Sequence, residues 1–184
     1  MVPKKASGCV SDRTMLAEWP IAAAWNVQGD CTHATFIDQV ARQFSIALPI
    51  APNTTARSDA VTAVWLGPRS WLLVAGSAGP PLVEFSGKRD ALNAAGGALF
   101  DLSASRVGFC LQGKGATDVL AMGCPLDLHP RAFRSGQCRQ SMFGHVNALL
   151  LKTDEVPTFV IMVARSFARG VWQTLERAVA HVPQ

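Results

Sequence analysis

The sequence predicts an α+β fold in which one unit of five elements, β-α-β-β-α, occurs twice. The clearest part lies near mid-chain, where Val107, Phe109 and Leu111 alternate with polar or small residues, as in a strand buried on one side. After Gly113 and Gly115 the spacing of apolar residues becomes helical as far as position 122. A strand-to-helix unit therefore occupies this stretch, and pairs of strands separated by helices are predicted on both sides of it.

The first half supplies one copy of the unit. Residues 22–27 favour a strand, and Thr32 is positioned to cap a helix in which Phe36, Val40 and Phe44 recur every four residues. Residues 60–66 and 71–74, separated by a turn at 67–70, predict a β-hairpin. Pro80 and the residue after it open a second helix that continues to about residue 95.

The second half repeats this order. Strands at 141–151 and 158–164 follow the central helix and are predicted to pair, and residues 168–182 carry the apolar stripe of a closing helix. Helices that alternate with strand pairs favour antiparallel or mixed sheets with helices packed on one face, arranged as two ferredoxin-like lobes. We expect an extended lead-in at 1–20 and a single domain at 21–184, with lobes at about 21–100 and 101–184.

Charge, cysteine content and hydropathy disfavour several classes of function and location. The 184 residues carry a net charge of +4 that is scattered along the chain, which disfavours nucleic-acid binding. Five cysteines without a C-x-x-C pair favour a reducing compartment. No signal-peptide core or spanning apolar segment is visible, so we expect no membrane partner and a cytoplasmic location.

Two stretches are candidates for a binding role. The turn at 112–115 matches no complete phosphate-binding motif, so a plain tight turn is favoured over an anion site. The segment from 127 to 145 holds the only dense polar cluster, which is either a solvated loop or a contact with an anion or a partner subunit. Its candidate contact residues are His129, Arg131, Arg134, Arg139 and His145.

The rest of the sequence contains no clear motif for metal binding or catalysis. His129 and His145 lack a third ligand at a recognisable spacing, so we predict no metal site. A Gly-x-Ser-x-Gly motif is absent, and the five tryptophans suit core positions or docking anchors better than a cofactor site. We therefore assign no catalytic, cofactor-binding or metal-binding residue.

Several short motifs together resemble the gamma subunits of heterotetrameric sarcosine oxidases over nearly the whole chain. They are Leu48-Pro49, Trp65-Leu-Gly-Pro-Arg-Ser-Trp-Leu-Leu73, Phe100-Asp-Leu-Ser103 with Arg106, Gly113-x-x-Ala116, Gly123-Cys-Pro-Leu-Asp-Leu128, Phe133-x-x-Gly136, and Ala164-Arg-Ser-Phe-Ala168 followed by Trp172-x-x-Leu175. The stretch from 100 to 127 also resembles the folate-binding aminomethyltransferase domains.

The resemblance implies an accessory subunit of a bacterial complex that oxidatively demethylates sarcosine to glycine. It implies partners of three kinds, the alpha, beta and delta subunits, which carry FAD, FMN, NAD, tetrahydrofolate and zinc, and no cofactor in this chain. It also implies a fold like that of a folate-binding aminomethyltransferase domain.

Two other functions stay open. The first is an independent folate-binding or aminomethyltransferase-like protein, against which stand the short length and the sequence Arg134-Ser-Gly-Gln-Cys138 in place of a Lys-Gly-Cys-Tyr signature. The second is an RNA-binding ferredoxin-like module, which the scattered charge and the missing aromatic RNP motif disfavour.

Overall fold

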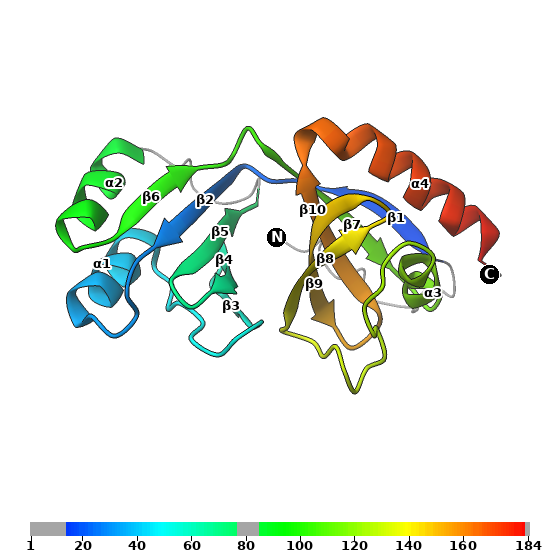
Figure 1. The fold of residues 1–184 in the computed structure, drawn as a ribbon, viewed down its shortest axis with the longest axis horizontal. Helices are drawn as coiled ribbons and strands as arrows, with labels where there is room; N and C mark the ends of the chain where they lie inside the picture. Colours follow the sequence, from blue (N-terminus) through cyan, green and yellow to red (C-terminus); the bar gives the residue numbers. More distant parts are fainter. Residues whose placement is uncertain (1–13, 77–84, 183–184) are drawn as a thin grey trace. The chain divides into compact units, whose positions relative to one another are not determined.

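The computed structural model describes residues 14–76 and 85–182 and divides them into two units (Figure 1). Unit 1 is Ile21–Ala104, and unit 2 combines residues 14–20 with 105–182. Within the described residues each unit holds one five-stranded sheet, whose strand pairs are all antiparallel, and two α-helices. The α+β fold with antiparallel sheets, predicted from the sequence, is confirmed.

Unit 1 follows the predicted order with two additional strands. Its elements are β2 (Ala23–Gln28), α1 (Ala34–Phe44), β3 (Thr55–Arg57), β4 (Val61–Gly67), β5 (Ser70–Ala75), α2 (Phe85–Ala94) and β6 (Ala98–Asp101), and its strand order is β3-β4-β5-β2-β6. The predicted hairpin is β4 and β5, whose register pairs Val64 with Leu72. The predicted start of the second helix at Pro80 lies outside the described residues.

The helix α1 forms where predicted, but its N-cap lies one residue after the proposed cap. Phe36, Val40 and Phe44 are buried, as their spacing requires. The N-cap residue is His33, which makes no side-chain cap bond. Thr32 instead donates hydrogen bonds from its backbone N–H (2.9 Å) and its hydroxyl (2.7 Å) to Oδ1 of Asp30. These bonds lower the pKa of Asp30, because they stabilise its charged form.

Unit 2 contains a strand from the segment that we expected to be an extended lead-in. Its elements are β1 (Met15–Trp19), β7 (Arg106–Gln112), α3 (Ala116–Ala121), β8 (Cys138–Phe143), β9 (Val146–Asp154), β10 (Thr158–Ala164), the short 3-10 helix η1 (Arg165–Phe167) and α4 (Ala168–His181). The strand order is β1-β7-β10-β9-β8. The expected lead-in at 1–20 is thus wrong for β1, which pairs along its whole length with β7.

The predicted strand at 141–151 is in fact a hairpin of β8 and β9. Its turn contains Gly144 at φ +59°, a left-handed conformation that glycine adopts without the steric penalty of a Cβ. The sequence prediction ignored this glycine and merged two strands into one. The predicted pairing with the strand at 158–164 is confirmed, since β9 pairs with β10.

The central strand β7 is buried on both faces in its middle, not on one side as predicted. Phe109 and Leu111 belong to the core cluster of unit 2. Cys110, on the opposite face, is buried too, with only 5% of its surface exposed. Burial on both faces also explains the continuous apolar run of β10.

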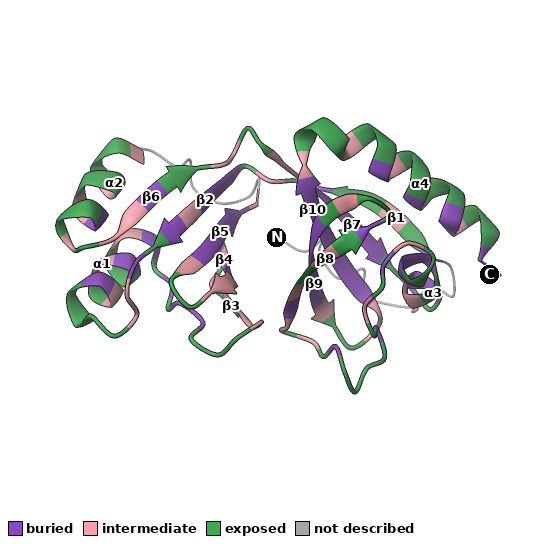
Figure 2. Cartoon of the chain, viewed as in Figure 1, coloured by how far each residue is buried: buried purple, intermediate pink, exposed green. Residues whose placement is uncertain are grey.

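Each unit has its own hydrophobic core between its sheet and its helices, which lie on one face of the sheet (Figures 1 and 2). Trp25 and Trp71 are buried in the core of unit 1, and Trp65 and Trp172 are partly buried against the cores. Trp19 is 7% exposed. Four of the five tryptophans therefore take core or near-core positions. No helix within the described residues is long and apolar enough to cross a bilayer.

The two sheets exchange their edge strands. The strand β1 directly precedes β2 in the chain but pairs with β7 of unit 2, whereas β6 directly precedes β7 but pairs with β2 of unit 1. Unit 1 and unit 2 then have equivalent strand orders, with β2 and β7 in corresponding positions. The chain thus consists of two repeats, each of which gives its first strand to the sheet of the other.

Candidate partner-contact site

The polar segment 127–145, proposed as a contact site, comprises most of the loop at 122–137 that connects α3 to β8, the strand β8 and the turn that follows it. Asp127 accepts a hydrogen bond from the backbone N–H of His129 through Oδ1 (2.9 Å), and Nδ1 of His129 accepts one from the N–H of Arg131 (3.2 Å). The backbone O of His129 accepts from Ala132 and Phe133. His129 therefore shapes a turn, which is a structural role that the sequence did not suggest.

Arg139 connects the end of this loop to β8 through hydrogen bonds. Its Nη1 donates to the carbonyl of Cys138 (2.9 Å), and its Nη2 donates to the carbonyl of Ala132 (3.2 Å) and to Oε1 of Gln137 (3.3 Å). The guanidinium also lies over the ring of Phe133, 5.4 Å from its centroid. Because its donors are used within the chain, Arg139 is better suited to holding the loop than to binding a partner.

The same loop is also held by a buried lysine, which the sequence analysis did not identify. Lys152 of β9 is 2% exposed, and its Nζ donates to the carbonyl of Phe133 (3.0 Å), which is itself buried. Its backbone N–H donates to Gln137 and its carbonyl accepts from Gly136. The only sequence signal was a lysine directly after the apolar run Ala-Leu-Leu-Leu of this strand, and such a lysine must find an acceptor if it is buried.

Arg131 and Arg134 are the exposed cations of the loop. Their backbone N–H groups are used locally, since that of Arg134 donates to Oε1 of Gln137 (2.9 Å). Their guanidinium groups have no hydrogen bond or ion pair within the described residues. They are therefore the two members of the predicted set whose charged ends stay available for a carboxylate.

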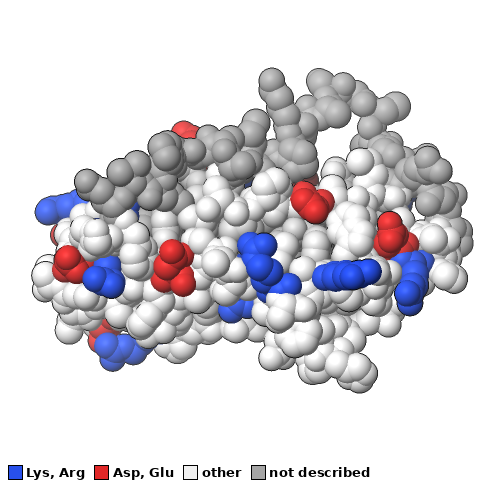
Figure 3. Space-filling view, turned by 90° about the horizontal axis from the view of Figure 1, so that it is seen from above, with Lys and Arg blue, Asp and Glu red and all other residues white. Residues whose placement is uncertain are grey.

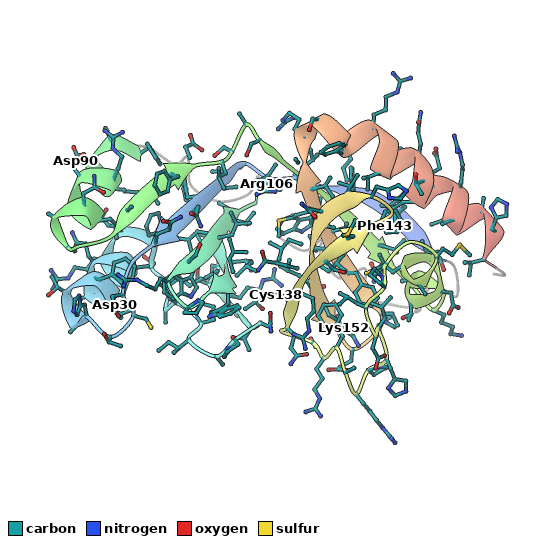
Figure 4. All side chains as sticks on the ribbon, in the orientation of Figure 1. Asp30, Asp90, Arg106, Cys138, Phe143 and Lys152 are labelled. Carbon is teal, nitrogen blue, oxygen red and sulfur yellow. The ribbon has the colours of Figure 1, made fainter. Side chains whose placement is uncertain are left out.

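His145 lies at the other end of the β8–β9 hairpin, in the turn between Phe143 and Val146. Figure 4 shows Phe143 and Cys138 at opposite ends of β8, with Lys152 near the Cys138 end. The N–H of Gly144 donates to Gly123, just beyond α3 (2.8 Å). His145 is thus separated from the arginines by the length of a six-residue strand, about 20 Å, and the predicted set does not form one site.

The turn after β7 uses its own amide groups. The N–H of Gly113 donates to Pro157 (3.0 Å), and that of Gly115 donates to the hydroxyl of Thr14 (3.1 Å). Both are engaged, which agrees with the tight turn favoured over an anion site. Among residues 14–76 and 85–182, no group of three or more His, Cys, Asp or Glu could hold a metal ion.

The thiol of Cys110 is poorly suited to nucleophilic chemistry. Cys110, Cys124 and Cys138 are buried and free, and Cys31 is half-buried and free. Burial raises the pKa of the Cys110 thiol, because the thiolate loses its solvation there. A thiol kept protonated is a weak nucleophile.

The face of the molecule in Figure 3 carries charges of both signs. Figure 3 shows acidic and basic side chains interspersed among uncharged residues on one face of the molecule.

Comparison with known proteins identifies relatives over most of the chain. The model of the sarcosine oxidase gamma subunit family matches residues 28–181. The chain is 35% identical over 130 residues to the sarcosine oxidase subunit gamma of Corynebacterium sp. (strain U-96), a match that covers 70% of this chain and 60% of that protein.

Solved structures give the same indication. The chain superposes on one from the heterotetrameric sarcosine oxidase of Corynebacterium sp. U-96, in complex with pyrrole 2-carboxylate, with a TM-score of 0.78 and 26% identity; the match covers 94% of this chain and 88% of that one. Aminomethyltransferase T of the glycine cleavage system from Bartonella henselae matches with a TM-score of 0.57 and 15% identity over 89% of this chain and 46% of that one. The second likeness concerns the fold alone and confirms the expected resemblance to an aminomethyltransferase domain. The chain belongs to the sarcosine oxidase gamma subunit family.

Proposed function

We propose that the chain is the accessory gamma subunit of a heterotetrameric sarcosine oxidase, an oxidoreductase complex that oxidatively demethylates sarcosine to glycine. The observation that carries this proposal is the family match over residues 28–181, which the likeness to a chain of such a complex supports. In this role the chain contributes to assembly and leaves the redox chemistry to its partners.

The partners follow from the same proposal. They are the alpha, beta and delta subunits, which would carry FAD, FMN, NAD, tetrahydrofolate and zinc between them, in the cytoplasm. The polar side chains described above support the division of labour, because most of those near the candidate site are used to hold a loop.

Arg131 and Arg134 are the proposed contact with a partner subunit. Both are exposed and lie on a loop that Lys152 and Arg139 hold in place. A guanidinium on a fixed loop loses less conformational freedom on pairing with a carboxylate than one on a floppy segment. We therefore retain these two of the predicted contact residues and assign local structural roles to His129 and Arg139.

Co-expression tests the function. The tagged chain should co-purify with the three companion subunits as one species on size exclusion, and this complex should contain flavin and produce peroxide from sarcosine. The chain purified alone is the control and should show no flavin absorbance and no peroxide. A complete, active complex that forms without this chain, or flavin bound by the chain alone, would contradict the proposal.

An independent folate-binding role is the alternative, and the likeness to aminomethyltransferase T does not favour it, since at 15% identity it extends only to the fold. Titration of the isolated chain with tetrahydrofolate, followed by calorimetry, distinguishes the two functions. Saturable binding at a ratio of one to one would favour the alternative.

A further inference from the structure

The strand β1 forms one outer edge of the unit 2 sheet, beside β7 (Figure 1). In an antiparallel pair, successive residues turn their backbone N–H and C=O groups alternately toward the neighbouring strand and away from it. At one end of β7 the N–H of Gly113 donates to Pro157, and at the other end the carbonyl of Ser105 accepts from Arg165. The odd-numbered residues of β7 therefore bond to β10, and the even-numbered residues bond to β1.

The register shows which backbone groups of β1 point away from the sheet. The residues of β1 that pair with even-numbered residues of β7 are Met15, Ala17 and Trp19, so these three bond to β7. Leu16 and Glu18 turn their N–H and C=O groups outward. None of these four outward groups has a hydrogen-bond partner among residues 14–76 and 85–182.

The outer edge of β1 is accessible. Met15, Ala17 and Glu18 are exposed, Met15 to 53%, and Leu16 is half-buried. Main-chain donors and acceptors at an open strand edge can pair with another chain. The edge of β1 is therefore a surface that a further strand could reach.

The outer strand β6 of unit 1 differs in this respect. The N–H of Leu102 donates to Ala24 of β2, so Leu99 is a residue that turns its backbone groups outward. Leu99 is only 3% exposed, which leaves little of its backbone open to a further strand. Accessibility therefore distinguishes β1 from β6, although both are edge strands.

Glu18 is the one charged residue of β1. Its side chain has no hydrogen bond or ion pair within the described residues. It pairs with Phe109 of β7, so it lies on the face of the sheet that packs against the helices, and it is exposed there. Opposite charges that face each other on paired strands stabilise the pairing. A strand added outside β1 would therefore gain from a basic residue opposite Glu18.

We propose that β1 receives an extended segment of a partner subunit as an additional strand of the unit 2 sheet, with a lysine or arginine of that segment opposite Glu18. An open strand edge suits an extended chain, because such a chain presents N–H and C=O groups at the matching spacing. The free carboxylate of Glu18 then selects among extended chains by charge. This inference rests on the proposed role in a complex.

Hydrogen exchange at single amides tests the pairing directly. In the isolated chain the outward amides of Leu16 and Glu18 should exchange fast, whereas those of Ala17 and Trp19, which bond to β7, should exchange slowly. In the assembled complex, exchange at Leu16 and Glu18 should slow by at least about tenfold. Contact through side chains alone would not produce this alternating pattern. Mass spectrometry with fragmentation to single residues measures it.

Two variants at one position separate the backbone from the charge. Glu18→Pro removes an outward N–H and leaves the bonds from β1 to β7, because proline is tolerated where a strand N–H faces outward. Glu18→Lys keeps the N–H and reverses the charge. Each should raise the dissociation constant for the companion subunits by at least about tenfold. Glu176→Lys, at an exposed glutamate of α4, is the matched control and should assemble as the wild type does.

The fold of the charge variant is checked in the isolated chain. Because Glu18 is exposed, the thermal unfolding midpoint of Glu18→Lys should stay within about 3 °C of the wild type. Weaker assembly of this variant then reports on the contact and not on unfolding. Normal assembly of both Glu18→Lys and Glu18→Pro would overturn the inference.

Three further results would overturn it. If Leu16 and Glu18 are protected in the isolated chain and lose this protection when residues 1–13 are deleted, a segment of the same chain occupies the edge. If their protection rises with concentration and a dimer appears on size exclusion, the edge takes a second copy. If the complex forms without slowing exchange at these amides, the edge takes no strand, although the proposed function stands. A wild type that does not assemble would contradict the proposed function together with the inference.

Discussion

The two units anchor the same loop in two different ways. In unit 1 the loop after α1 is held by Trp71 of β5, whose indole N–H binds the buried carbonyl of Pro49. In unit 2 the loop after α3 is held by Lys152 of β9, whose ammonium binds the buried carbonyl of Phe133. Each repeat therefore fixes this loop through one buried nitrogen donor.

The difference follows the length of the loop. The connection from α1 to β3 spans 45–54, whereas the connection from α3 to β8 spans 122–137 and carries the exposed arginines. The longer loop needs a second clamp, which Arg139 provides from the first residues of β8. A neutral indole suffices in unit 1, while unit 2 buries a cation. The extra polar residues of unit 2 therefore serve largely to hold its longer loop.

The largest expected effect is at the anchor of unit 1. Trp71→Ala should lower the free energy of unfolding by about 3–5 kcal/mol, because it empties a fully buried site. Phe159→Ala, at the corresponding inward position of β10, should cost about 1 kcal/mol less, since no buried carbonyl loses its donor there. Urea unfolding of both variants measures this difference. Equal losses would mean that the Trp71 hydrogen bond adds nothing to the packing.

Loss of the anchor of unit 2 should have a smaller effect on the free energy of unfolding, but it should clearly loosen the loop that Lys152 holds. Lys152→Ala should lower the free energy of unfolding by about 1–3 kcal/mol, because the carbonyl of Phe133 would be left buried without a donor. Hydrogen exchange should accelerate at the amides of Gly136 and Gln137 and not in the loop after α1. Lys152→Met, which keeps the length of the side chain, is the control for lost packing. Unchanged exchange at these amides in Lys152→Ala would refute the anchoring role.

The turn that divides β8 from β9 gives a smaller effect. Gly144→Ala should cost about 1 kcal/mol, because its φ of +59° is unfavourable for a residue with a Cβ although no atom lies within 4 Å of the added methyl. Gly67→Ala, at the end of β4 in unit 1, is the control, since Gly67 also has open space around it but no positive φ. Thermal unfolding should separate the two variants. Equal unfolding midpoints would mean that the positive φ of Gly144 does not penalise alanine there.

The smallest effect on stability is expected at the exposed arginines. Replacing Arg131 and Arg134 together with alanine should change the free energy of unfolding by no more than about 0.5 kcal/mol while weakening assembly with the companion subunits. Replacing the exposed Arg42 and Arg57 of unit 1 in the same way is the matched control. If the double variant assembles normally but the complex loses turnover, the loop serves the active site and the accessory role must be revised.

Regular spacing made some elements predictable. Phe36, Val40 and Phe44 identify α1 because a stripe of one apolar residue per turn has no other simple explanation. The hairpin of β4 and β5 is recognisable from two apolar runs around a short turn. The short strands β1, β3 and β6 were not recognised as separate elements, because strands of three to five residues carry little periodicity and take their order from pairing with distant strands.

The candidate site was predictable only as a concentration of charge. The sequence identifies the arginines of the loop, but it does not distinguish Arg139, which is used internally, from Arg131, which is exposed. It also grouped His145 with them, because closeness in the sequence is not closeness in space across a hairpin. The outward backbone groups of Leu16 and Glu18 depend on the register of β1 against β7, which no local pattern reveals.

The exchange of edge strands makes the two repeats depend on each other as the halves of a split protein do. A break in the backbone between α2 and β6 would give one fragment that carries β1 and another that carries β6, and each fragment would hold a strand that the other needs for its sheet. Neither fragment could complete five strands alone, so each would expose an unpaired strand edge prone to aggregation. Expressed together, they would restore both sheets by complementation. Once the strands are exchanged, neither repeat can be deleted without leaving the sheet of the other one strand short.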